Sequence, residues 1–118
     1  MAKGHTKVTY DEEEDILSFT KGRRVQASID IGDFVIDVDS NGFITGIEVL
    51  NATETFKMTA AQLMELNEIS MNVNYRPNYV LIHLIMSLKN KEKDLTIPLT
   101  VDLGHSTVRT DSYKFAVA

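Results

Sequence analysis

Apolar and polar residues alternate with a period of two along most of this chain, which is typical of β-strands that bury one face. The clearest case is the segment 79–88. One of its faces is wholly apolar and consists of Val80, Ile82, Leu84, Met86 and Leu88. The other face is half apolar and consists of Tyr79, Leu81, His83, Ile85 and Ser87. A strand with two such faces is expected to be covered on both sides.

Turn signals divide the rest of the chain into further strands. These are expected at 7–10, 16–20, 25–31, 34–39, 43–50, 95–103 and 106–117. In the strand 25–31, one face is expected to hold Val25, Ala27, Ile29 and Ile31. Pro98 cannot donate a hydrogen bond to a neighbouring strand, so the strand 95–103 is expected at a sheet edge or with a bulge at Pro98.

The Asn41-Gly42 pair is the strongest hairpin signal in the chain, because a type I′ turn requires positive φ at both central residues. Pairing the strands 34–39 and 43–50 across this turn separates apolar from acidic residues. The apolar face holds Phe34, Ile36, Val38, Ile47 and Val49. The acidic face holds Asp37, Asp39 and Glu48. A slip of one residue would mix the two faces, so this register is favoured.

One helix is predicted over residues 60–70. Thr59 and Gln62 have the spacing of a capping box, and apolar residues follow at helical spacing, at Ala60, Leu63, Leu66 and Ile69. The sequence therefore predicts an α+β fold, predominantly antiparallel β-sheet built of hairpins, with one short α-helix. At 118 residues the chain is expected to be a single domain. Residues 1–5 are expected to be flexible, with hairpins and the helix over 6–71 and further strands over 72–118.

Composition argues against several classes of function. The absence of cysteine removes disulfides, thiolate zinc sites and cysteine nucleophiles. A net charge of −5 and a pI near 5.1 argue against nucleic acid and anionic membranes as partners. The longest mostly apolar stretch, residues 79–88, has ten residues and is interrupted by His83 and Ser87, whereas a membrane-spanning helix needs about 20 apolar residues. We therefore expect a cytoplasmic protein without a nucleic-acid or membrane partner.

The stretch 10–52 resembles a family of small proteins known as domain of unknown function 2283. The residues that carry the resemblance are Tyr10-Asp11, Glu13, Asp15 and Leu17, then Asp37-x-Asp39, Gly42, the run 46–50 and Asn51-Ala52. With the predicted helix, the likeness extends over roughly residues 7–70. Ser18 stands where family members often carry an aromatic residue. The family has no established activity, so the resemblance implies a fold more than a function. Some relatives are encoded beside candidate toxins, which implies an antitoxin-like role.

Four residues have the spacing of an EF-hand calcium loop. They are Asp37, Asp39, Asn41 and Glu48. Helices enter and leave such a loop, whereas the flanking sequence here is typical of strands. We therefore interpret the segment as a hairpin whose aspartates bond to their own backbone. Divalent-cation binding at these four residues is the alternative.

The other charged groups of the sequence favour no catalytic chemistry. The acidic run 11–15 is interpreted as a solvated turn, since acid catalysis needs a carboxyl group in an apolar pocket. The basic turn 21–24 is interpreted as a solvated loop that could dock an acidic partner. His83 lies in strand sequence, yet no nucleophile or second base can be named beside it. No catalytic residue, cofactor or metal is predicted, and the sequence does not favour an enzyme.

The sequence favours a small, non-catalytic protein-interaction module that self-associates. The expected interface residues lie on the half-apolar face of the segment 79–88, at Tyr79, Leu81, His83 and Ile85. A homodimer with two-fold symmetry would bury this face. The competing arrangement is a monomer in which the strand 106–117 folds over it. The alternatives to an interaction module are cation binding by the hairpin 37–48 and a small-ligand site or minor enzyme around His83.

Overall fold

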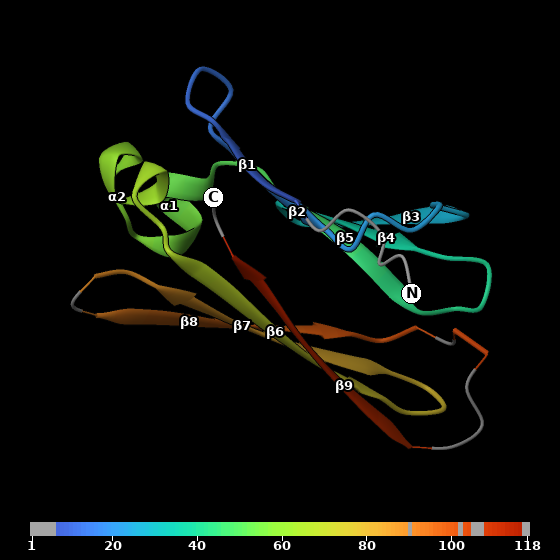
Figure 1. Ribbon diagram of the computed structural model, residues 1–118. Helices are drawn as coiled ribbons and strands as arrows, with labels where there is room; N and C mark the ends of the chain where they lie inside the picture. Colours follow the sequence, from blue (N-terminus) through green and yellow to red (C-terminus); the bar gives the residue numbers. More distant parts are fainter. Residues whose placement is uncertain (1–6, 90, 102, 105–107, 117–118) are drawn as a thin grey trace.

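The computed structural model describes residues 7–89, 91–101, 103–104 and 108–116. In these residues, nine strands form two antiparallel sheets that pack face to face (Figure 1). The N-terminal sheet has the order β1-β2-β5-β4-β3, and the C-terminal sheet has the order β8-β7-β6-β9. The predicted fold class, α+β with mostly antiparallel sheet, is confirmed. The predicted flexible residues 1–5 and parts of the predicted strands 95–103 and 106–117 lie outside the described residues.

The N-terminal sheet consists of five short strands. They are β1 (Lys7–Asp11), β2 (Ile16–Thr20), β3 (Ala27–Ile31), β4 (Phe34–Val38) and β5 (Ile44–Val49). The predicted strand 25–31 begins at Ala27 instead, and both Val25 and Ile31 are exposed. The reason is its position, because β3 is an edge strand of the sheet. A period-two pattern alone does not distinguish an edge strand from a central one.

The hairpin of β4 and β5 has the predicted register, with Ile36 opposite Ile47. A bulge follows at Asp37/Val38. The turn itself is not type I′, because Gly42 has φ 81° whereas Asn41 does not have positive φ. The Gly42 amide donates to the Asp39 carbonyl and the Asp39 amide donates to the Phe43 carbonyl. This three-residue loop is a type I turn followed by a left-handed glycine.

Two short helices replace the single predicted one. They are α1 (Ala52–Phe56) and α2 (Ala60–Met64). The predicted capping box is present, since Thr59 and Gln62 each accept from the other's backbone amide. The prediction of a helix to residue 70 is wrong, because β6 (Glu68–Tyr75) begins first. Ile69 fits both the helical spacing and the alternation of β6, and the strand forms because every second residue from Ile69 to Tyr75 is then fully buried.

The C-terminal sheet is completed by β7 (Val80–Ser87), β8 (Glu92–Leu99) and β9 (Arg109–Ala116). The predicted strand 95–103 thus begins earlier and ends earlier, and Pro98 lies on an edge strand as predicted. The last strand pairs with β6 in the plane of the sheet. It therefore does not fold over the outer face of β7, so the placement of this strand in the competing arrangement is wrong.

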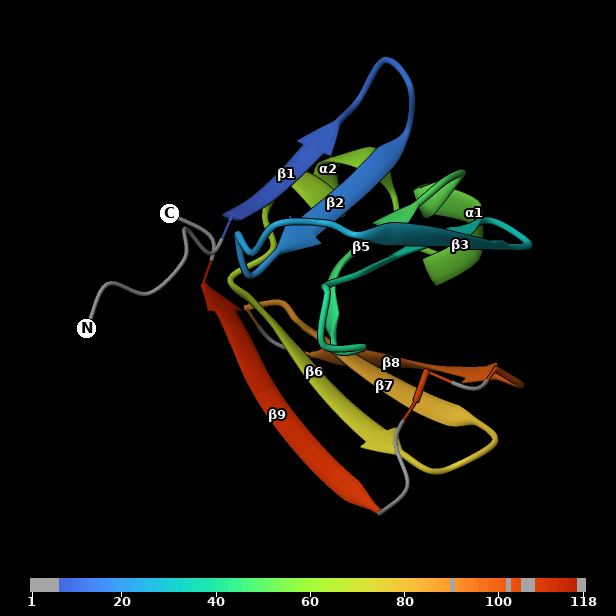
Figure 2. The same ribbon diagram turned by 90° about the vertical axis from the view of Figure 1, so that its right-hand side faces the viewer.

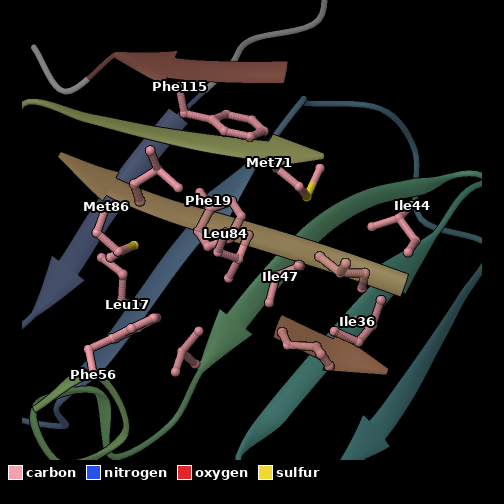
Figure 3. Close-up of a cluster of buried hydrophobic side chains, with 14 of the residues drawn as sticks. Leu17, Phe19, Ile36, Ile44, Ile47, Phe56, Met71, Leu84, Met86 and Phe115 are labelled. Atoms are coloured by element: carbon pink, nitrogen blue, oxygen red, sulfur yellow. The ribbon is translucent and has the colours of Figure 1, made fainter. Parts of the chain in front are cut away.

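The core lies between the two sheets, where their inner faces meet (Figure 3). Leu17, Phe19 and Ile47 of the N-terminal sheet face Met71, Leu84, Met86 and Phe115 of the C-terminal sheet. The rings of Phe19 and Phe115 lie 5.3 Å apart between centroids. The apolar face of β7 is fully buried here, as its alternation predicts. The helices lie at one end of the two sheets (Figure 1).

Candidate functional site

The outer face of the C-terminal sheet holds the four residues predicted as an interface. Tyr79 is 41% exposed, and Leu81, His83 and Ile85 are partly exposed. Across to β8, Leu81 lies opposite Pro98 and Ile85 lies opposite Asp94. In the part of the chain that the structure describes, no helix or strand lies over this face (Figures 1 and 2). The face is therefore open to contact.

This outer face is nearly free of charge along its centre. The outward positions of the two central strands are Glu68, Ser70, Asn72, Asn74, Leu81, His83, Ile85 and Ser87. Of these, only Glu68 carries a formal charge, and it lies at the end of β6. Charged residues are depleted at the centres of protein interfaces relative to other surfaces. The composition of the face therefore fits a contact surface.

His83 lies on this same face, near one acidic neighbour. Its Nε2 atom is 3.8 Å from a carboxylate oxygen of Asp94, which is itself largely exposed on the edge strand β8. The cross-strand neighbours of His83 are Thr96 and Asn72. The nearest acidic group to the His83 imidazole in the described residues is thus an exposed carboxylate on the neighbouring strand.

A shallow groove of about 310 Å³ lies on the outer face of the N-terminal sheet. Its lining residues are Lys7, Thr9, Ser18, Phe19, Thr20, Asp37, Ile47 and Glu48. Gly46 lies within this surface, and a Cβ atom there would come within 3.1 Å of the Phe19 carbonyl oxygen and 3.2 Å of the Thr20 side chain. A glycine is therefore needed for β2 and β5 to approach each other.

The four candidate cation ligands divide between this groove and the hairpin loop. Asp37 and Glu48 line the groove, and Asp37 accepts a hydrogen bond from the Ser28 hydroxyl at 2.7 Å. In the loop, one carboxylate oxygen of Asp39 accepts from the amides of Asn41 and Phe43. Strands flank the loop on both sides, as the hairpin interpretation predicts. Among the described residues, no three acidic or histidine side chains are close enough to hold a metal ion together.

Within the acidic run, Asp11 accepts a hydrogen bond from the Glu14 amide, and Asp15 is bonded more extensively. Its carboxylate accepts hydrogen bonds from the Tyr10 hydroxyl at 2.6 Å, from the Thr53 hydroxyl at 2.6 Å and from the Thr53 amide at 3.1 Å. Its carbonyl accepts from the amide of Ala52. Asp15 thus bonds to the first two amides of α1, whose own N-cap residue, Asn51, makes no side-chain capping bond.

These contacts explain two shifted pKa values. The hydrogen bonds from Thr53 and Tyr10 lower the pKa of Asp15. Burial, followed by the hydrogen bond to Asp15, raises the pKa of Tyr10 to about 12. Glu12, Glu13 and Glu14 are exposed, as expected for a solvated turn. The prediction is therefore correct for the middle of the run and wrong for Asp15.

Lys21 is buried, although the basic turn 21–24 was predicted to be solvated. Arg23 and Arg24 are exposed, but Lys21 is only 7% exposed. Its Nζ atom lies 3.9 Å from the centre of the Tyr113 ring. Burial lowers the pKa of Lys21, and the negative charge of Asp111 opposes this effect.

A second set of contacts joins the same end of the two sheets. The Arg109 guanidinium lies 4.0 Å from the centre of the Phe43 ring, and its Nε atom is 2.9 Å from Asp111. The buried hydroxyl of Tyr75 accepts from the Ile44 amide at 2.8 Å. The contacts of Arg109 with Phe43 and of Tyr75 with Ile44 run from the hairpin of β4 and β5 to β9 and β6, so they hold the sheets together. Sequence reasoning missed them because the partners lie far apart along the chain.

Comparison with known proteins finds a family model that matches the first part of the chain. Residues 7–52 match the model of a family described as protein of unknown function, DUF2283. The resemblance predicted from Tyr10, Asp15 and the Asp37-x-Asp39 hairpin is thereby confirmed. The matched segment contains the whole N-terminal sheet and ends at the first residue of α1.

Two archaeal proteins are similar to this chain over longer stretches. An uncharacterized protein of Methanocaldococcus jannaschii is 37% identical over 60 residues, which cover 50% of this chain and 52% of that protein. The chain thus spans about half the length of this relative. A putative hypoxanthine phosphoribosyltransferase of Methanosarcina mazei is 24% identical over 89 residues, which cover 75% of this chain and 72% of that protein. No solved structure matches the chain. Neither helix that the structure describes is long and apolar enough to cross a membrane.

Proposed function

We propose that this chain is a non-catalytic interaction module that self-associates through the outer face of its C-terminal sheet. The observation that carries the proposal is an uncovered, nearly uncharged face with a partly exposed apolar stripe along β7. Its members are Tyr79, Leu81 and Ile85, with His83 between the two aliphatic residues. Pro98 extends the apolar surface onto β8.

The arrangement of the two sheets supports this choice of surface. The N-terminal sheet also has an outer face, but that face carries Lys7, Asp37 and Glu48 around its groove. Hydrated charges are costly to bury, whereas aliphatic side chains gain from burial. The face of β7 is therefore the better of the two for a lasting contact, and a second copy of the chain offers a surface of the same character.

Light scattering on a sizing column tests the proposal. We expect a two-chain species at micromolar concentrations, where one chain has a mass of 13.3 kDa. Ile85→Lys should convert the dimer to a monomer, because the substitution places a charge at the centre of the apolar stripe. Circular dichroism melting establishes that the variant is folded.

Val35→Lys is the matched control. Val35 is also a partly buried aliphatic residue on an outward position, but it belongs to the N-terminal sheet, opposite Glu48. The Val35→Lys chain should remain a dimer. A single-chain mass for the unaltered protein at tens of micromolar, within the range in which weak specific dimers form, would overturn the proposal.

A further inference from the structure

We infer that the second copy packs with its two-fold axis along the strands, so that Asp94 of each copy lies opposite Lys114 of the other. This inference rests on the proposed function and adds the orientation and the charged contacts of the dimer. The orientation follows from the strand register, which places directly opposite residues of β8, β7, β6 and β9 in one row across the outer face. The positions of the charges in that row decide the orientation.

One row across the C-terminal sheet contains both a base and an acid. Asp94 lies opposite Ile85, Ile85 lies opposite Ser70, and Ser70 lies opposite Lys114. Residues directly opposite each other in antiparallel strands point to the same face. The row therefore runs from an exposed acid on the edge strand β8, across the apolar stripe, to an exposed base on the edge strand β9.

The two edges of the outer face consequently differ in charge. The β8 edge holds Glu92 and Asp94, while the β9 edge holds Lys114 as its charged outward residue among those described. The centre between them holds Ile85 and Ser70. The face is thus acidic along one side and basic at the other, and Glu68 at the end of β6 is the one charged outward residue of the two central strands.

A two-fold axis that lies in the plane of contact can have two simple orientations. An axis across the strands places β8 of one copy over β8 of the other, so that acidic edge meets acidic edge. An axis along the strands exchanges the two sides and preserves each row, so that β8 of one copy lies over β9 of the other. Only this second orientation places Asp94 opposite Lys114, and symmetry makes the contact twice.

The same orientation suits the apolar stripe. With the axis midway between β6 and β7, the two copies of β7 are offset sideways by about one strand spacing, roughly 4.8 Å. Side chains from two packed sheets interdigitate at a separation of about 10 Å. Leu81 and Ile85 of one copy can therefore pack beside the same residues of the other. In this orientation each Asp94 faces a base of the other copy instead of an acid.

Charge exchange tests this orientation. We expect Asp94→Lys alone and Lys114→Asp alone each to weaken dimerisation about tenfold or more, because each creates two like-charge contacts per dimer. The double exchange, Asp94→Lys with Lys114→Asp, should restore the affinity of the unaltered chain. Mixing the two single variants should also restore it, because a mixed dimer pairs opposite charges at both contacts. Sedimentation equilibrium at low and high salt measures all four, and high salt should reduce the differences.

The controls carry the same changes of charge on the other sheet. Asp30→Lys and Lys7→Asp alter exposed residues of β3 and β1, and neither should change the dissociation constant. If Ile85→Lys dissociates the dimer while the exchange variants behave like these controls, the orientation is wrong and the proposed function stands. Failure of the double exchange or of the mixture to restore dimers also overturns the orientation. A single-chain species for the unaltered protein overturns both proposals.

Discussion

The carboxylate of Asp15 receives hydrogen bonds from two places, the strand β1 before it and the helix α1 that follows 38 residues later in the chain. Its backbone is left-handed, with φ 56°, a conformation that aspartate tolerates better than most residues. The negative charge also lies at the N-terminus of α1, where the free amides favour an anion. One side chain therefore fixes where the short helix begins.

This arrangement predicts an acid-sensitive contribution to stability. Folding holds the pKa of Asp15 below its ordinary value of 3.8. The unfolded chain therefore binds the proton more readily, so the stabilisation is complete above that value and is lost as the pH falls toward the folded pKa. Asp15→Asn should lower the free energy of unfolding at pH 7 by about 1–3 kcal/mol. It should also flatten the acid limb of the stability curve.

Urea unfolding between neutral and acidic pH measures both effects. Glu13→Gln, which removes an exposed charge from the same turn, is the matched control and should change little. Superimposable curves for Asp15→Asn and the unaltered chain would show that the carboxylate does not stabilise the fold.

Gly42 provides a second test at the scale of single residues. Its φ of 81° lies in the region that side chains disfavour. We expect Gly42→Val to cost about 1–3 kcal/mol through backbone strain, and Ser40→Ala, in the same loop, to cost less than about 0.5 kcal/mol. Chemical denaturation of both variants measures the difference, and equal small effects would contradict the strained turn.

The hairpin of β4 and β5 predicts the response of the protein to calcium. Calcium takes six to eight oxygen ligands, but the loop carboxylate of Asp39 is already bonded to two amides. We therefore expect millimolar calcium to raise the melting temperature by less than about one degree. Differential scanning fluorimetry with calcium and with a chelator checks this. A micromolar binding isotherm that Asp37→Ala abolishes would contradict it.

Elements with a single periodic pattern could be predicted from sequence. The hairpin 34–49 could be placed with its faces, because a shift of one residue would expose Ile36 and Ile47. At Ile69, by contrast, two patterns overlap, and only the position of β6 between β7 and β9 decides between them. The helix α1 has five residues and draws its cap from Asp15, so local sequence carries little signal for it.

The predicted interface and the contact of Lys21 with Tyr113 between the sheets differ in the same way in how far sequence could predict them. The outward positions of Leu81 and Ile85 follow from alternation within one strand, so sequence was sufficient for them. Burial of Lys21 depends on Tyr113, which reaches it only when β9 is placed beside β6. Contacts between distant segments depend on the order of the strands in the sheets, which could not be predicted from the sequence.

At the scale of the whole molecule, the family match and the architecture have nearly the same boundary. The matched residues 7–52 contain the N-terminal sheet, and the residues that cover its inner face come mainly from the C-terminal sheet. We therefore predict that a chain of residues 1–57 alone does not fold. Its inner face would expose Leu17, Phe19 and Ile47, which are buried in the full chain, and burial of apolar surface is the main stabilising force.

Circular dichroism in a urea titration checks this prediction. The full chain should unfold in one cooperative transition, whereas residues 1–57 should give a gradual, non-cooperative change. A sharp transition for the short chain, without self-association, would mean that the N-terminal sheet is stable without its cover.

The sharing of one core between two sheets also bears on inheritance. A relative that retains only the matched segment keeps the apolar inner face of the N-terminal sheet but not the C-terminal sheet that covers it here. Such a relative must bring a different layer, from its own downstream residues or from another chain. Descent would then preserve one layer of the sandwich while the opposite layer is replaced. The segment that matches the family thus specifies one layer of the sandwich, whereas the proposed contact surface lies on the other layer.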